Sequence, residues 1–266
     1  MSAPPAPPIV WVNGSFIAEP ATTPAITALD NGVLVGLGVF ETVAIRGGVA
    51  FARRRHVERL RASAAIVGVT LDSALIESAI DAVLSRWGRR DGRMRITATA
   101  GGALIVSADV ARSVAPVGTL VVAPWPRNER SPLVAAKTTA YADNVLAFDY
   151  AQTRGATDAL FLNSRGEVCE GSRTNIFAAC EGRLVTPPLS SGCLAGVTRA
   201  LVLEYGAARE TTLGLAELMG ASEVFVTSAL RGAQPITAID GVTIGDATRP
   251  HAQRVARVLA ALNADA

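Results

Sequence analysis

The residue with the clearest chemical signal is Lys137, the only lysine among 25 basic residues, of which the other 24 are arginine. Because the chain uses arginine at its other basic positions, we expect that position 137 requires a chemical property that a guanidinium lacks. Lysine can lose its proton and attack a carbonyl carbon to form a Schiff base. The small, uncharged residues at 135–139 follow Leu133 and Val134, and such surroundings disfavour the ammonium form. The residue therefore indicates pyridoxal phosphate or a carbonyl substrate, with a leftover surface lysine as the alternative.

Pyridoxal phosphate also needs an anion near its pyridine nitrogen, and Glu170 is the candidate. It lies at the end of a predicted strand, beside Gly171, where a carboxylate can be presented to a ligand. A carboxylate there would keep the pyridine nitrogen protonated and make the ring an electron sink. The alternative is a solvated carboxylate at a strand end.

A phosphate group needs a cradle, and residues 190–199 are typical of one because they are glycine-rich and lead directly into an apolar helix. Backbone N–H groups at a helix start, with the Thr198 hydroxyl, are suited to an anion. Thr198 is equally consistent with a plain N-cap. Arg59, on a predicted helix, would add positive charge, unless it simply faces solvent.

The composition restricts the class of protein. Hydrophobic residues make up 50% and charged residues 18% of 266 residues, which is typical of a compact globular protein with a large core. The net charge is +2, and the arginine cluster at 53–61 is too short for a nucleic-acid stripe. No apolar run is long enough to span a membrane, and we expect a cytoplasmic protein. The three cysteines are not at metal-ligand spacing, so we expect no metal site and reduced core thiols.

Turn signals and apolar periodicity predict a mixed α/β (α+β) fold. The predicted strands are residues 9–12, 15–17, 38–45, 49–51, 93–99, 104–108, 120–123, 158–163, 167–170, 175–179, 183–186 and 223–227, with a further hairpin at 240–241. The predicted helices are residues 54–67, 71–87, 143–154, 198–208 and 250–262.

A proline-rich, charged stretch divides the chain. We expect a flexible tail at residues 1–8, a small N-terminal α/β domain at 9–122, a linker at 123–133 and a larger C-terminal α/β domain at 134–266.

Several ordered blocks of the sequence resemble the class IV aminotransferase family, the fold-type IV group of pyridoxal-phosphate enzymes. That group includes branched-chain and D-amino acid transaminases and 4-amino-4-deoxychorismate lyase. The blocks are Asp30–Gly32, Gly36–Thr42, His56–Leu60, Lys137–Tyr141, Asn144–Ala147, Gly155–Leu160, Glu170–Phe177, Thr186–Leu189 and Gly196–Arg199.

The resemblance implies roles for individual residues and an assembly. Lys137 would bond the cofactor aldehyde and act as the catalytic residue, while Glu170 would pair with the pyridine nitrogen. Tyr141 would lie close to the bond that Lys137 makes. The other cofactor-binding residues that the resemblance implies are Arg59, Gly196, Val197, Thr198 and Ser228. It also implies two α/β domains with the cofactor in the cleft between them, and a homodimer.

Departures from the family pattern bear on the substrate, which we expect to be a small-molecule amine or amino acid. Ala229-Leu230 stands where transaminases tend to carry small hydroxyl residues and resembles the lyase branch, so we expect 4-amino-4-deoxychorismate lyase, an enzyme of folate biosynthesis. The alternatives are a transaminase of branched-chain amino acids, D-amino acids or amines, and a relative that binds without turnover. Thr42 and Arg231 are candidates for the substrate carboxylate.

Overall fold

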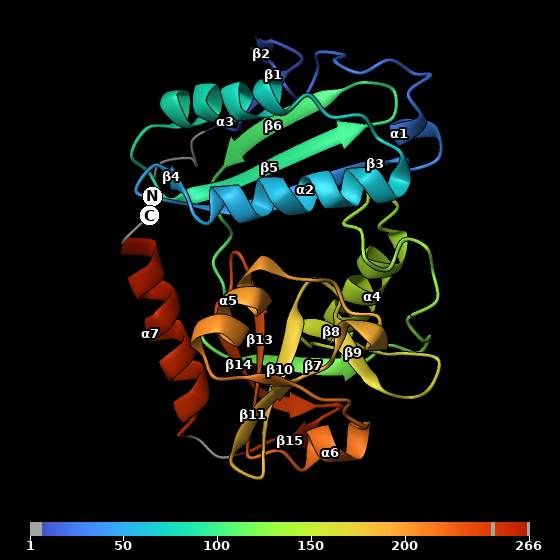
Figure 1. Cartoon of the computed structure of the whole chain (residues 1–266), viewed down its shortest axis with the longest axis vertical. Helices are drawn as coiled ribbons and strands as arrows, with labels where there is room; N and C mark the ends of the chain where they lie inside the picture. The colour runs from blue at the N-terminus through green and yellow to red at the C-terminus, as the bar shows by residue number, and fades with distance from the viewer. Residues whose placement is uncertain (1–6, 246–247, 265–266) are drawn as a thin grey trace. The chain divides into compact units, whose positions relative to one another are not determined.

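The computed structural model describes residues 7–245 and 248–264, and it divides into two compact units (Figure 1). Unit 1 contains the described residues up to Ser113 together with Ala136–Ala140, and unit 2 contains Val114–Ala135 and the chain from Tyr141 onward. The chain thus passes from one unit to the other at three places, whereas the sequence suggested a single linker at 123–133. The predicted tail at 1–8 lies, over residues 1–6, outside the described residues.

Unit 1 is built on an antiparallel sheet of six strands within the described residues, in the order β2-β1-β6-β5-β3-β4. The strands are β1 (Ile9–Val12), β2 (Ser15–Ile17), β3 (Gly38–Arg46), β4 (Val49–Ala50), β5 (Gly92–Thr99) and β6 (Leu104–Asp109). The strands predicted at 9–12 and 15–17 pair as the hairpin β1–β2, and those predicted at 38–45 and 49–51 pair as the hairpin β3–β4. Each hairpin turns on two residues, Asn13 and Gly14 with φ angles of 43° and 100°, and Gly47 and Gly48 with φ angles of 55° and 90°, as a turn with two left-handed residues requires.

Two long helices complete the core of unit 1, and both were predicted from apolar periodicity. Helix α2 (Arg53–Val67) packs on β3, and α3 (Ser73–Trp87) packs on β6 and β1. The side chains of Leu60, Ile80 and Trp87 are buried in the core that these helices share with the sheet. The short helix α1 (Asn31–Leu34) was not predicted.

Unit 2 is built on a mixed sheet of nine strands in the described part of the chain. Eight follow the order β12-β11-β10-β13-β14-β7-β8-β9, and β15 pairs with β14. The strands are β7 (Gly118–Val122), β8 (Asp158–Leu162), β9 (Val168–Gly171), β10 (Asn175–Cys180), β11 (Arg183–Thr186), β12 (Arg209–Glu210), β13 (Glu223–Ser228), β14 (Gly232–Ile239) and β15 (Val242–Thr243). Strand β7 runs parallel to both of its neighbours, β14 and β8.

The helices of unit 2 are α4 (Ala142–Gln152), η1 (Leu189–Ser191, a 3-10 helix), α5 (Val197–Tyr205), α6 (Leu215–Met219) and α7 (Pro250–Ala264). The three longer ones, α4, α5 and α7, confirm the predicted helices. In the core of the unit, the rings of Phe177 and Phe225 stack with centroids 5.1 Å apart. Cys169, Cys180 and Cys193 form no disulfide; Cys169 and Cys193 are buried, as expected of core thiols, whereas Cys180 is half-buried and is not a core residue. None of the described helices combines the length and apolar character that membrane crossing requires.

Candidate functional site

Lys137 is held by backbone hydrogen bonds on both sides within unit 1. Its N–H donates to Ser63 Oγ on α2 at 3.0 Å, and its carbonyl accepts from the N–H of Phe40 on β3 at 2.9 Å. The side chain is half-buried, and Nζ lies 4.3 Å from the centroid of the Phe40 ring. The structure therefore fixes the backbone of the only lysine and sets its amine against an aromatic face.

Arg59, also in unit 1, is oriented by a buried carboxylate. Its Nε donates to Glu41 Oε1 at 2.8 Å and its Nη2 to Oε2 at 2.7 Å, a two-pronged pairing that fixes the guanidinium plane. His56 Nδ1 lies 2.7 Å from the same Oε2. The side chain of Glu41 is 0% exposed. Burial opposes its ionisation, but the charge and hydrogen bonds of Arg59, with the His56 hydrogen bond, lower the pKa of Glu41 to about 2.

Thr42 follows Glu41 on β3 and therefore projects from the other face of the strand. It is half-buried and lies opposite Arg95 of β5. The guanidinium of Arg95 lies 3.9 Å from the Phe40 centroid. The cross-strand neighbour of Thr42 is therefore the cationic Arg95. The role of Thr42 toward a substrate carboxylate stays a prediction.

Glu170, in unit 2, is a buried carboxylate that is held by protein groups. It lies on β9 with 5% of its surface exposed. The Leu194 N–H donates to Oε2 at 2.9 Å, and Asn175 Nδ2 lies 3.5 Å from the same atom. Arg127 Nη2 lies 3.3 Å from Oε1. A carboxylate this deeply buried requires such partners, so the solvated alternative for Glu170 does not apply.

Tyr141 precedes α4, and its hydroxyl donates to the Ser172 carbonyl oxygen at 3.1 Å. Asn144 Nδ2 donates to the same carbonyl at 2.7 Å. Burial raises the pKa of Tyr141, and the negative charge of Glu170 raises it further. The phenol therefore remains protonated at neutral pH and can act as a hydrogen-bond donor.

The predicted phosphate cradle is a helix start without a side-chain cap. Helix α5 begins at Val197 with Gly196 as its N-cap residue, and no side chain of the described residues caps it. A Cβ at Gly196 would collide with Asn175 Oδ1. Thr198 is buried inside the helix, so the plain N-cap alternative for it is wrong. A bare glycine beside the N–H groups of a first helical turn suits an anion such as phosphate.

Ser228 and Arg231 lie at the turn that joins β13 to β14. Ser228 Oγ accepts a hydrogen bond from the Arg231 N–H at 3.2 Å. The Arg231 guanidinium lies 3.3 Å from the buried carboxylate of Asp158, and it donates to Gln234 Oε1 at 3.0 Å. Arg231 is thus bound by protein groups, and its predicted role toward a substrate stays a prediction.

The sequence indicated no individual role for Glu41, which pairs with Arg59, for His56, which contacts Glu41, or for Arg127, which pairs with Glu170. A signal for Glu41 exists, because it is an ionisable residue in an otherwise apolar segment that forms a buried strand. Such a residue requires a partner. Arg127 and Glu170 are 43 positions apart in the sequence, and no local pattern joins them.

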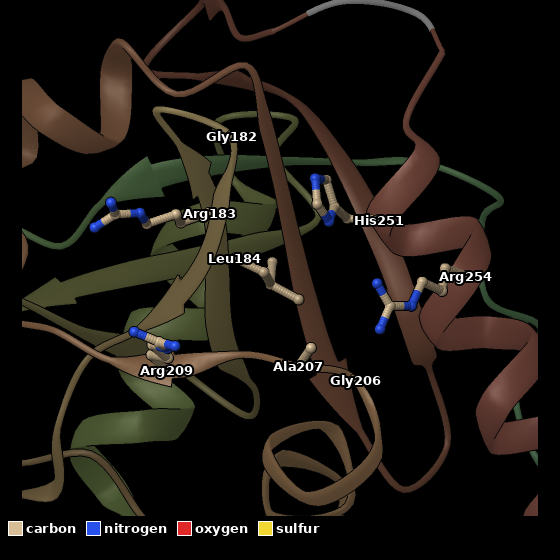
Figure 2. A pocket seen from close by; sticks show the side chains of 8 residues that line it. All are labelled: Gly182, Arg183, Leu184, Gly206, Ala207, Arg209, His251 and Arg254. Atoms are coloured by element: carbon tan, nitrogen blue, oxygen red, sulfur yellow. The ribbon is translucent and has the colours of Figure 1, made fainter.

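A hollow of about 420 Å³ in unit 2 involves none of the predicted residues. Its lining consists of Gly182, Arg183, Leu184, Gly206, Ala207, Arg209, His251 and Arg254. In Figure 2, Arg183 and Arg209 point to one side of Leu184, and His251 and Arg254 lie on the other. The hollow is therefore separate from the residues that the sequence predicted to bind the cofactor.

Comparison with known proteins identifies the family. Residues 38–239 match the amino-transferase class IV family. The chain is 30% identical to the D-alanine aminotransferase of Bacillus licheniformis, over 83% of this chain and 85% of that protein. It is 26% identical to the branched-chain-amino-acid aminotransferase of Escherichia coli K12, over 89% of this chain and 86% of that protein.

A solved structure shares the fold. The Legionella pneumophila protein named "Putative 4-amino-4-deoxychorismate lyase" matches with a TM-score of 0.84 and 23% identity, over 92% of this chain and 97% of that one. The predicted mixed α/β fold of the pyridoxal-phosphate type is thereby confirmed. The chain belongs to the class IV aminotransferase family, whose members use pyridoxal phosphate, the cofactor that the sequence predicted.

Proposed function

We propose that this chain binds pyridoxal phosphate through Lys137 and Arg59 of unit 1 and through Glu170 and the start of α5 of unit 2. The residues present fit the group. They include an amine against an aromatic ring, a buried carboxylate held by a guanidinium, and a helix start with no side-chain cap in the described structure. Tyr141 and Ser228 complete the proposed set.

The cofactor, when bound, supplies an electron sink for bonds at the carbon that carries the substrate amine. Lys137 binds its aldehyde and, when released as a neutral amine, takes the proton from that carbon as general base. Glu170 keeps a proton on the pyridine nitrogen. Arg59 and the first-turn N–H groups of α5 hold the phosphate, so that the reacting carbon stays within reach of the lysine.

We further propose that the reaction is that of 4-amino-4-deoxychorismate lyase. After Lys137 has taken the proton from the ring carbon that carries the amine, the C–O bond to the enolpyruvyl group would break with its electron pair on the oxygen. The enolpyruvate that leaves would take up one proton on its terminal carbon to become pyruvate, and the ring would become that of 4-aminobenzoate. The observation that carries this proposal is the turn after β13. It offers Ala229 and Leu230 where transaminases tend to carry small hydroxyl residues, and the Arg231 guanidinium that follows is bound to Asp158.

The second candidate is a transaminase of branched-chain amino acids, D-amino acids or amines, and the two aminotransferase relatives favour it. In that reaction Lys137 returns the proton to the cofactor carbon, and no carbon–oxygen bond breaks. The two reactions therefore need the same cofactor residues and differ in where the proton goes.

One assay separates the two functions. The purified chain, loaded with pyridoxal phosphate, is incubated with 4-amino-4-deoxychorismate, and 4-aminobenzoate and pyruvate are measured. A parallel reaction contains 2-oxoglutarate with branched-chain amino acids, D-alanine or an amine, and keto-acid formation is measured. We expect equal amounts of 4-aminobenzoate and pyruvate in the first reaction. Turnover in the second reaction alone identifies the transaminase. Binding of the cofactor without turnover in either supports the non-catalytic alternative.

We also propose that the chain forms a homodimer and works in the cytoplasm. Light scattering coupled to size-exclusion chromatography tests the dimer. The expected mass is about twice the 27.5 kDa of one chain, and a mass equal to one chain contradicts the proposal.

A further inference from the structure

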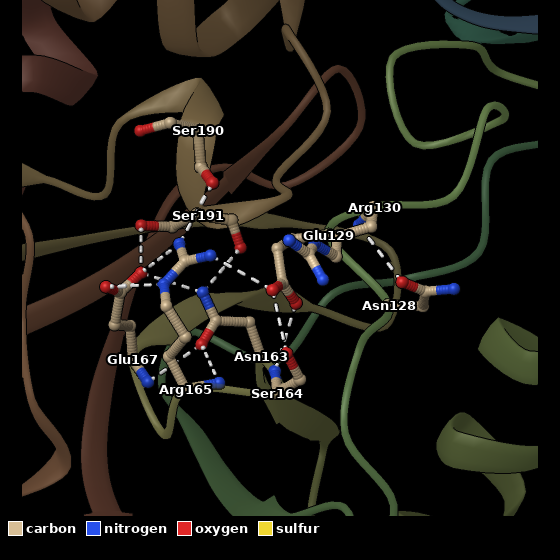
Figure 3. A network of polar contacts seen from close by, with 9 residues as sticks. All are labelled: Asn128, Glu129, Arg130, Asn163, Ser164, Arg165, Glu167, Ser190 and Ser191. Atoms are coloured by element: carbon tan, nitrogen blue, oxygen red, sulfur yellow. Dashed lines mark hydrogen bonds and ion pairs between the residues drawn. The ribbon is translucent and has the colours of Figure 1, made fainter.

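Arg165 lies in the turn between β8 and β9 and joins three segments of unit 2 (Figure 3). Its Nε and Nη2 donate to the two carboxylate oxygens of Glu167, at 2.9 and 2.7 Å. Its Nη1 donates to Glu129 Oε1 at 3.0 Å, and its Nη2 also donates to the Ser190 carbonyl at 3.2 Å. One guanidinium therefore connects the segment 127–131, the turn 163–167 and the loop 189–194.

The acceptors around Arg165 are themselves held in place. Glu129 accepts from the Ser164 N–H at 3.1 Å and from its hydroxyl at 2.7 Å. Glu167 accepts from Asn163 Nδ2 at 2.8 Å and from Ser191 Oγ at 3.0 Å. These bonds hold both carboxylates where the guanidinium can bridge them, so the cluster is an ordered network rather than a chance surface pair.

A glycine brings the loop 189–194 against the segment 127–131. Gly192 has a φ of +96°, and a Cβ there would lie 2.8 Å from the Cβ of Glu129. Both the backbone conformation and the short distance require glycine at this position. The two segments are thus packed directly on each other as well as bridged by Arg165.

The same two segments carry the partners of Glu170. Arg127 precedes Glu129 by two residues, and Leu194, whose N–H donates to Glu170, follows Gly192 by two residues. Resting on the proposed role of Glu170, we propose that Arg165 is a positioning residue that keeps Leu194 and Arg127 on the Glu170 carboxylate. The Arg165 side chain is 47% exposed, and its bonds go to Glu167, Glu129 and the Ser190 carbonyl, so it acts on Glu170 through the segments that carry these groups.

The test compares wild type with Arg165→Met, which keeps the aliphatic stem and removes the guanidinium. Hydrogen exchange at the Leu194 amide is measured on the full chain with and without bound cofactor, and the dissociation constant of pyridoxal phosphate is measured by absorbance. We expect exchange at Leu194 to accelerate about tenfold and the dissociation constant to rise about fivefold. Arg165→Lys should restore the Leu194 exchange rate and the dissociation constant only in part. Its ammonium group keeps the positive charge but cannot form two parallel hydrogen bonds with the Glu167 carboxylate.

Two further variants control the experiment. Arg93→Met removes an ion pair of similar exposure, with Asp109 in unit 1, and should leave Leu194 exchange and cofactor affinity unchanged. Gly192→Ala should act in the same direction as Arg165→Met, since it pushes the loop away from Glu129.

The outcomes separate this proposal from the proposed function. Unchanged exchange at Leu194 in Arg165→Met overturns the positioning role. Faster exchange with unchanged cofactor affinity also overturns it, provided that Glu170→Gln weakens cofactor binding. If Glu170→Gln leaves cofactor binding and absorbance unchanged, the proposed role of Glu170 is itself refuted, and the positioning role fails with it.

Discussion

The buried pairing of Glu41 with Arg59 makes a quantitative prediction for the variant Glu41→Gln. Glutamine has nearly the same shape as glutamate, but it carries no negative charge to pair with Arg59. Its amide N–H₂ group would also lie against an N–H donor of the Arg59 guanidinium. Removing one partner of a buried, hydrogen-bonded ion pair destabilises a protein by about 3–5 kcal/mol. A carboxyl whose pKa falls from 4.5 to about 2 on folding contributes about 3 kcal/mol at neutral pH, which agrees with the lower end of that range.

The pH dependence gives this prediction a second check. Because folding lowers the pKa of Glu41, its contribution is complete above pH 4.5 and is lost as the pH falls toward 2. The linkage relation gives a loss of about 1 kcal/mol between pH 7 and pH 3.5. The stability difference between wild type and Glu41→Gln should therefore shrink by about a third over that interval.

Urea denaturation at pH 7 and at pH 3.5 measures this difference, with Trp11 and Trp87 as fluorescent reporters in unit 1. Glu77→Gln is the matched control. It removes a partner of Arg53 on the surface, where Glu77 is 42% exposed, and should reduce stability by less than about 1 kcal/mol. A difference below about 1 kcal/mol for Glu41→Gln at pH 7, or one that stays the same at pH 3.5, refutes the reasoning.

Three further predictions concern the cofactor cradle, Tyr141 and the core. Gly196→Ala places a Cβ against Asn175 and should raise the dissociation constant of pyridoxal phosphate about tenfold, as followed by absorbance titration; unchanged affinity contradicts the cradle. Tyr141→Phe removes the hydrogen bond to the Ser172 carbonyl and should reduce unfolding free energy by about 1 kcal/mol in urea, and an equally stable variant would show that this bond contributes nothing. Leu60→Ala leaves a cavity at a fully buried position and should reduce the unfolding free energy by about 2–5 kcal/mol in urea denaturation. A loss under about 1 kcal/mol would argue against a packed core at this position.

The parts of the fold that were predictable are those whose signal is local. The Asn13-Gly14 turn needs only its own two residues, and the periodicity of α2 and α3 lies within each helix. The short helix α1 has only a weak local signal, its N-cap Asp30, which accepts from the Gly32 N–H, and its four residues carry no apolar periodicity. The same carboxylate is also bound by Thr99 and Gly101 from a distant part of the chain. The pairing of β7 with β14 joins residues more than 100 positions apart, which no local pattern encodes.

The same distinction applies to the candidate site. Lys137 and Glu170 could be proposed from the sequence because residue type and position carry the signal, in one case through the rarity of lysine in this chain. The partners that hold Arg59 and Glu170 could not be found in this way. Glu41 reaches Arg59 only because α2 packs on β3, and Arg127 reaches Glu170 only once the sheet of unit 2 has formed.

The central claim is that the amine of Lys137 bonds pyridoxal phosphate. Borohydride reduction of the cofactor-loaded chain, followed by peptide mass spectrometry, tests it directly because Lys137 is the only lysine. We expect a phosphopyridoxyl group on the peptide that contains Lys137, and none on the Lys137→Arg variant. Recovery of the label on the N-terminal amine alone, or an unlabelled Lys137 peptide from a saturated protein, contradicts the account.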